Sequence, residues 1–324
     1  MRKLYKYYSS KLDLEEYLKN PTMRITQLSA LNDPFEGFIT NGVLSKLIEK
    51  VYPIISTSNK TTLRDIRKSR RFVMRQINSV GITSFSETSR NLLMWAHYAS
   101  EHSGYCIGYK IPLFDANTNI KAPNSEFKKV NYDSLLFDHE HIIRLNSNNV
   151  DDDTIFSELT ERILTTKSDE WAYEKEHRYI TPIERCDIIR IFKTKNPWPE
   201  EIIQTISDSQ IDGSHDVDDR KDYLDLISKR TDSQLTEAIH SPYSVEMKLK
   251  DFKNIMFLKK IPIESIETVY LGTKADYESV EKAYDLFDKE KSMQHINFYT
   301  YELSKERYEI YPVSIPMNKN EGRT

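Results

Sequence analysis

The chain has 324 residues, 38% hydrophobic and 30% charged, a balance typical of a soluble globular protein with one large domain or two ordinary ones. Its formal net charge of -4 argues against bulk attraction to nucleic acid or anionic membrane, although a local basic patch is compatible with it. The two cysteines, Cys106 and Cys186, lack metal-ligand spacing, so we expect neither a disulfide framework nor a metal site. The basic start is not followed by an apolar run, and no stretch of about 20 apolar residues occurs. We therefore expect no signal peptide, no membrane contact and a cytoplasmic location.

The chain opens with a predicted strand, helix and strand. Aromatic and branched residues indicate strands at 4–8 and 23–28, on either side of a short helix. A turn-prone segment containing Asn32, Asp33 and Glu36 follows the second strand directly. This arrangement is a common way to build one wall of a ligand cleft, so we expect these three polar residues to contact a substrate.

Residues 41–78 have a helical pattern with a basic second half. The basic side chains are Arg64, Arg67, Lys68, Arg70, Arg71 and Arg75. Such a run is most often the solvated face of a helix. Because Arg outnumbers Lys, and the guanidinium fork matches phosphate oxygens, contact with phosphate is the alternative.

Two predicted strands, 80–87 and 104–109, flank a helical turn at 92–99. Ser84 and Ser86 are spaced to share one face of the first strand. The helical turn presents Trp95, His97 and Tyr98, of which we expect Trp95 and His97 to contact a substrate. For the histidine, a hydrogen-bonded structural role is the ordinary alternative, since no metal ligand stands nearby.

The most chemically suggestive stretch is KSDEWAYEKEHRYI, residues 167–180. Glu174, Glu176 and Arg178 are two residues apart, so in a strand all three would point to one face. Aromatic bulk stands just upstream, at Trp171 and Tyr173. The alternative is an exposed strand face with its own Glu–Arg pairing, which would contribute little.

The rest of the chain predicts a mixed fold. Strands are expected at 188–192, 263–272, 296–301 and 308–314, and helices at 155–164 and 276–289. We expect residues 1–194 and 251–316 to form a single α+β domain with a mixed, largely antiparallel curved sheet and flanking helices, because no regular βαβ alternation occurs. Residues 195–250 are interpreted as a polar helical insertion outside the sheet, and 317–324 as a disordered tail.

Several motifs occur together in a fixed order: LYKY from Leu4, LSALNDPFE from Leu28, TSFSE from Thr83, LLMWAHYA from Leu92, GYCIGY from Gly104, W-x-YE-x-E-x-R from Trp171 and VYLG from Val269. In this order they resemble the bacterial domain of unknown function 2971 family. The resemblance covers nearly the whole chain apart from residues 195–250. It names a family without implying a chemistry.

The layout is also, more distantly, similar to the ADP-ribosyltransferase fold, in which three strand motifs assemble an NAD pocket. The resemblance implies that LYKY, with Tyr5, Lys6 and Tyr7, supplies the first motif and TSFSE, with Ser84 and Ser86, the second. It implies an E-x-E third motif with Glu176 as the catalytic carboxylate and Glu174 as its helper. Lys6 departs from the His or Arg that the fold family places there. The remaining NAD contacts would be Tyr98, Tyr173 and Arg178.

Three functions are compatible with these features. The first is an NAD-consuming ADP-ribosyltransferase that modifies a macromolecule, protein or nucleic acid, as a toxin or anti-phage defence effector controlled by an antitoxin or regulatory partner. The second is a ligand-sensing or protein-interaction module with a degenerate pocket. The third is a nuclease that uses the Glu, Arg and His side chains with the basic helix. For each aromatic residue named above, packing in the core is the structural alternative.

Overall fold

Strand β3 (Val80–Ser86) lies at the centre of the largest sheet. One of its edges pairs with β2 (Thr22–Gln27) at the start of the strand and with β1 (Arg2–Tyr8) at its end. Its other edge pairs along its whole length with β8 (Glu176–Pro182). The three strand motifs identified in the sequence are therefore neighbours, as predicted.

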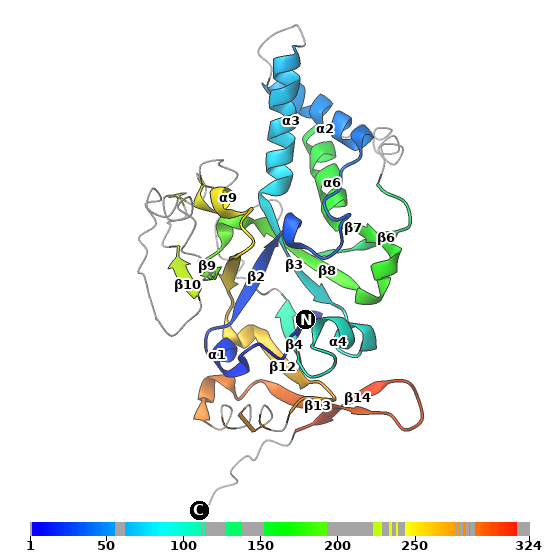
Figure 1. Cartoon of the computed structure of the whole chain (residues 1–324), viewed down its shortest axis with the longest axis vertical. Coiled ribbons are helices and arrows are strands. Elements are labelled where there is room, and N and C mark those ends of the chain that lie inside the picture. The colour runs from blue at the N-terminus through cyan, green and yellow to red at the C-terminus, as the bar shows by residue number, and fades with distance from the viewer. Residues whose placement is uncertain are drawn as a thin grey trace, which may run out of the picture.

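The computed structural model describes residues 2–55, 62–111, 127–137, 152–192, 223–228, 244–276 and 289–315, with a few single residues between these ranges. Within them, twelve strands form one open sheet (Figure 1). Ten of them follow the order β10-β9-β11-β2-β3-β1-β4-β12-β13-β14. The other two branch from β3: β8 pairs with β3, and β5 pairs with β8. The other strands of this sheet are β4 (Tyr105–Ile111), β5 (Phe127–Lys129), β9 (Ile188–Phe192), β10 (Tyr223–Ile227), β11 (Ile255–Lys260), β12 (Ile266–Leu271), β13 (Asn297–Leu303) and β14 (Ile310–Ser314).

The described pairings of this sheet are antiparallel, except for β12 with β13. A separate parallel pair is formed by β6 (Asn131–Asp133) and β7 (Thr166–Ser168). The predicted α+β class with a largely antiparallel sheet is confirmed.

Three long helices cover one face of the sheet around β3 and β8, and Figure 1 shows them together at one end of the molecule. They are α2 (Asn41–Ile55), α3 (Leu63–Asn78) and α6 (Asp152–Thr165). Alternation along the strands decides which side chains meet them: Ile82 and Ile180 pack against the helices, whereas Phe85 and Tyr179 belong to the core on the opposite face.

The short helices connect the strands. They are α1 (Leu14–Lys19), α4 (Leu92–Tyr98), α9 (Val245–Leu249), and the 3-10 turns η1 (Leu28–Ala30), η2 (Asp169–Glu174), η3 (Ile183–Arg185), η4 (Ile263–Ser265) and η5 (Lys291–Met293). Helix α4 packs on the sheet through Trp95, which contacts Tyr7 and Tyr301 edge-on. The chain leaving α4 passes so close to β12 that a Cβ on Gly272 would lie 2.0 Å from the His102 carbonyl oxygen.

One detail of the predicted organisation differs from the structure. Residues 195–250 do not lie wholly outside the sheet, because Tyr223–Ile227 pairs with β9 as an edge strand and Leu249 of α9 is buried in the core beneath it. A polar composition can hide an edge strand, since only one of its faces is buried. Most of the remaining insertion, most of the predicted helix 276–289 and the tail 317–324 lie outside the described residues.

Candidate functional site

A buried cluster of charged side chains lies where β8 meets η2 and α4. Its five members come from four segments: Glu36 from the turn after η1, Lys167 from β7, Glu174 from the end of η2, and Glu176 and Arg178 from β8. We call these five residues the ion cluster. All five side chains are almost completely removed from solvent.

Glu176 and Arg178 form the tightest contact of the cluster. The Arg178 Nε atom donates to Glu176 Oε1 at 2.9 Å, and Nη2 donates to Oε2 at 3.0 Å, which makes a bidentate pair. The same guanidinium donates from Nη1 to the Leu164 carbonyl oxygen at 2.7 Å. Arg178 is therefore fixed by both an anion and the backbone of α6.

Lys167 connects the three carboxylates. Its Nζ atom lies 2.7 Å from Glu174 Oε2, 3.2 Å from Glu36 Oε1 and 3.5 Å from Glu176 Oε2. Glu36 also reaches Arg178, with 3.0 Å between Oε2 and Nη2. Three carboxylates thus share two cations, so the cluster has a formal charge of -1 when all three are ionised.

The surroundings separate the acidities of the carboxyl groups. Burial by itself would raise the pKa of Glu176, but Arg178 and Lys167 outweigh burial and hold the pKa at about 2. For Glu36, burial is the larger effect, so its pKa is raised in spite of the same two cations. The three carboxylates raise the pKa values of Lys167 and Arg178 against the opposing effect of burial. Both cations therefore stay charged at neutral pH.

The local backbone brings Glu174 to the cluster by a different route from Glu176. Ser168 caps η2, and Lys175 then adopts a left-handed conformation with φ of 47° before β8 begins. Ser86 fixes this bend, since its hydroxyl donates to the Glu174 carbonyl oxygen at 2.7 Å. The prediction that Glu174 shares a strand face with Glu176 and Arg178 is wrong, because Glu174 ends a 3-10 turn. The three side chains nevertheless meet.

An aromatic rim stands beside Glu174. The Tyr98 hydroxyl donates to Glu174 Oε1 at 2.5 Å, and the ring of Tyr173 lies 5.9 Å from that of the exposed His97. Trp171 also lies beside the cluster, with its ring centroid 6.1 Å from that of Tyr173 and 4.6 Å from Lys167 Nζ. Asn91 ties the two elements together by capping α4 and donating to the Tyr173 carbonyl oxygen.

Other predicted site residues are placed as follows. Asn32 is exposed near the rim, and Asp33 is buried, where its Oδ1 accepts from the Phe35 backbone. Ser84 lies opposite Arg178 in the β3–β8 register, and its hydroxyl helps to lower the pKa of Glu176.

Three predicted contacts are explained by packing instead. Trp95 is fully buried and donates from Nε1 to the Ser89 carbonyl oxygen, which leaves no surface for a substrate. Tyr7 is buried against it, and Tyr5 packs against Tyr270. Large aromatic side chains at these positions complete the core, so the expectation of a ligand contact from them is not supported.

Lys6 lies beside the cluster without belonging to it. Its neighbours in β1, Tyr5 and Tyr7, face α4, so alternation directs Lys6 to the opposite face. There its Nζ atom donates to the Ser84 carbonyl oxygen at 3.0 Å and lies 5.7 Å from the Phe85 ring centroid. Burial lowers its pKa to about 8, although Glu176 acts in the opposite direction. Lys6 thus lies on the opposite sheet face from Glu176 and Arg178, and its expected contact with NAD stays a prediction.

The sequence did not single out Lys167 or Tyr132 as site residues. The Tyr132 hydroxyl accepts a hydrogen bond of 2.7 Å from the Glu176 backbone nitrogen. Lys167 stands in a three-residue strand whose partner, β6, is distant in sequence. The chemistry of the residue types could have indicated Lys167, because a lysine is almost never fully buried unless carboxylates pair with it.

Within the described ranges, no group of three or more His, Cys, Asp or Glu side chains is arranged to hold a metal ion, and no helix is long and apolar enough to cross a membrane. Cys106 and Cys186 are both buried.

Comparison with known proteins adds a family. No curated protein and no solved structure matches the chain. A family model described as "Protein of unknown function (DUF2971)" matches residues 94–179, a segment that contains Tyr98 and every member of the ion cluster except Glu36. The family resemblance of the sequence motifs is thereby confirmed over residues 94–179.

Proposed function

We propose that the protein is an NAD-consuming ADP-ribosyltransferase that modifies a macromolecule, either a protein or a nucleic acid. The observation that carries this proposal is the formal negative charge of the ion cluster beside the aromatic rim of Tyr98, Tyr173 and His97. A flat cationic ring such as nicotinamide suits both features, because aromatic faces and a carboxylate attract it.

The reaction would break the bond between the nicotinamide nitrogen and the ribose carbon. The bonding electrons leave with nicotinamide, and positive charge develops on the ribose as in glycoside chemistry. A nucleophilic oxygen or nitrogen of the acceptor then bonds to that carbon and releases its proton to a carboxylate. A fixed carboxylate stabilises the developing cation without reorganising water.

Glu174 is the member of the cluster best placed to contact this substrate. Both carboxylates are bound on both oxygens, Glu176 by Arg178 and Glu174 by Tyr98 and Lys167, but Glu174 is the one that meets the rim, through Tyr98. The roles expected from the E-x-E resemblance are therefore exchanged in this proposal. Glu174 acts on the substrate. The side chain of Glu174 is positioned by Glu176, Arg178 and Lys167.

The test is release of nicotinamide and transfer of label from NAD labelled in the adenylate part, with cell extract as the source of acceptor. We expect the Glu174→Gln variant to lose activity by about 100-fold or more, the typical cost of removing one preorganised electrostatic group. Glu170→Gln is the matched control, because Glu170 is an exposed carboxylate of the same 3-10 turn. Equal activity of the two folded variants would contradict the proposal, as would a parent protein that leaves NAD intact.

A second function, a ligand-sensing or protein-interaction module, is favoured by one feature of the same region. The turn that supplies Glu36 also exposes two aromatic side chains, Phe35 at 55% and Phe38 at 54%. Exposed aromatic residues of this kind are typical of a surface that a partner covers. NAD binding without nicotinamide release, or a partner that protects these phenylalanines, would support this second function over catalysis.

A further inference from the structure

Helix α3 has two opposite faces of different chemistry. Ser69, Val73 and Ile77 are buried against the sheet side and recur every four residues. About half a turn away lies a stripe of positively charged side chains, which we call the basic face: Arg64, Arg67, Lys68, Arg71 and Arg75. From Arg64 to Arg75 the stripe extends over about 16 Å of helix.

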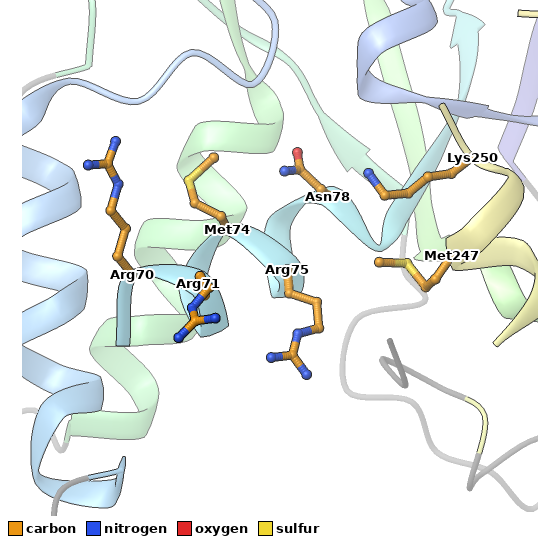
Figure 2. Close-up of a pocket in the computed structure, with 7 residues that line it drawn as sticks. All are labelled: Arg70, Arg71, Met74, Arg75, Asn78, Met247 and Lys250. Carbon is orange, nitrogen blue, oxygen red and sulfur yellow. The ribbon is translucent and has the colours of Figure 1, made fainter. Parts of the chain in front are cut away.

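The base of this helix borders an open groove. The groove has a volume of about 330 Å³ and lies between α3 and the segment of α9. Figure 2 shows Arg71 and Arg75 projecting from α3 on the same side, while Met247 and Lys250 extend toward them from α9. The remaining lining residues are Arg70, Met74 and Asn78. Four of the seven side chains that line the groove are therefore cations.

Among the described residues, neighbouring acids do not pair with the arginines of this surface. Among the residues that the structure describes, no ion pair involves Arg64, Arg67, Arg70, Arg71 or Arg75. Lys68 lies 3.9 Å from Asp65, the one acidic residue of α3, and Lys250 lies 3.1 Å from the exposed Asp251. A local excess of positive charge on a chain with net charge -4 indicates a specific anionic partner rather than general attraction.

We propose that the basic face and its groove bind the phosphate backbone of a nucleic-acid duplex. Arginine predominates, and its planar fork matches phosphate oxygens in a way that lysine does not. Over about 16 Å a duplex presents on the order of nine phosphate charges, more than enough to engage the stripe. The groove lining contains no aromatic side chain, so stacking of unpaired bases does not contribute and the backbone is the feature recognised.

This inference does not rest on the NAD chemistry, and its test is separate from it. The parent protein is titrated with fluorescently labelled duplex DNA, duplex RNA and single-stranded DNA at several salt concentrations. With four to five phosphate contacts, the logarithm of the binding constant should fall against the logarithm of salt with a slope of about -4. Vesicles rich in anionic lipid form a further arm of the experiment.

The informative variant is Arg71→Gln/Arg75→Gln. Both side chains are at least partly exposed and lack ion-pair partners among the described residues, so we expect the thermal midpoint to stay within about 1 °C of the parent. Duplex affinity at about 0.1 M salt should fall roughly 50-fold, and the slope should decrease by about 2. Lys305→Gln/Arg307→Gln is the control, since it removes the same charge from exposed positions between β13 and β14.

The proposal is supported if the first variant loses duplex binding and the control keeps it. Duplex binding by both variants at the parental level would overturn it, and so would a parent that does not bind either duplex at about 0.05 M salt. Binding to vesicles alone, or to single strands much more tightly than to duplexes, would overturn it as well. The salt slope of the parent provides a measurement that does not depend on any variant folding.

Discussion

Replacing Glu176 with glutamine tests how much the ion cluster contributes to folding. Glu176→Gln keeps the shape of the side chain and removes its charge. The residue is only 2% exposed, and its carboxylate accepts both hydrogen bonds of the Arg178 fork. After the substitution, Arg178 remains buried without its bidentate partner.

The direction of the effect follows from the ion pair. Burial alone would raise the pKa of Glu176, but Arg178 and Lys167 lower it on folding, so the ionised carboxylate stabilises the fold at neutral pH. Breaking a buried ion pair by removing one partner typically costs about 3–5 kcal/mol. For a chain of this size we expect a loss of roughly 5–10 °C in thermal midpoint.

The assay is chemical and thermal unfolding of parent and variant across pH, with Glu36→Gln as the matched control. Because the folded-state pKa of Glu176 is lowered, its stabilising effect is complete above about pH 4.5 and is lost as the pH falls toward 2. The difference between parent and variant should therefore be constant at pH 6–8 and shrink below about pH 4.5. The pKa of Glu36 is raised, so its ionisation opposes folding as the pH rises, and Glu36→Gln should cost less.

Two results would refute this reasoning. One is a Glu176→Gln protein as stable as the parent at neutral pH. The other is a Glu36→Gln protein that loses at least as much stability, because the two carboxyl groups share both cations and differ in the direction of their pKa shift. In either case the assigned balance between burial and ion pairing would be incorrect.

Two further substitutions test the surroundings of the site. Tyr98→Phe removes the hydroxyl that donates to Glu174. We expect it to lower the free energy of unfolding, measured in denaturant, by about 1.5–3 kcal/mol. An unchanged denaturation midpoint would mean that this hydrogen bond does not form in solution. Gly272→Ala should lower the thermal midpoint more than Gly37→Ala does. At Gly272 the new Cβ would lie 2.0 Å from the His102 carbonyl oxygen. At Gly37, where φ is 71°, the closest atom would be a leucine methyl at 3.1 Å. Similar midpoints for the two glycine variants would contradict this ranking.

Much of the sheet could be predicted from residue pattern alone. Aromatic and branched residues identify β1, β3 and β8, and the absence of regular βαβ alternation predicts antiparallel pairing. The continuous helix expected at 41–78 is instead the pair α2 and α3. Thr62 caps the N-terminus of α3 by accepting from the Asp65 backbone nitrogen, and the hydrophobic period alone does not report this start.

The site was less predictable because its geometry depends on one backbone conformation and on distant segments. A period of two correctly places Glu176 and Arg178 on one face of β8. It fails for Glu174, because Lys175 adopts the left-handed conformation, which non-glycine residues rarely adopt and which sequence does not announce. Lys167 and Glu36 reach the cluster from β7 and from the turn after η1, and no local pattern reports such contacts.

The ion cluster links stability to any chemistry at the site. It joins the turn after η1, β7, η2 and β8, so a change at one carboxylate alters the position of elements that carry the others. Burial and the two cations also push the pKa of Glu36 up and that of Glu176 down, which is the separation that acid–base chemistry requires. Loss of activity in a variant of Glu36, Glu176 or Arg178 can therefore come from two causes: displacement of the elements that carry the site, or loss of the charge itself. Glu174 separates them, since it meets the rim while the bidentate pair beside it stays intact. A Glu174→Gln protein that keeps most of its stability and loses turnover would assign the chemistry to that carboxylate.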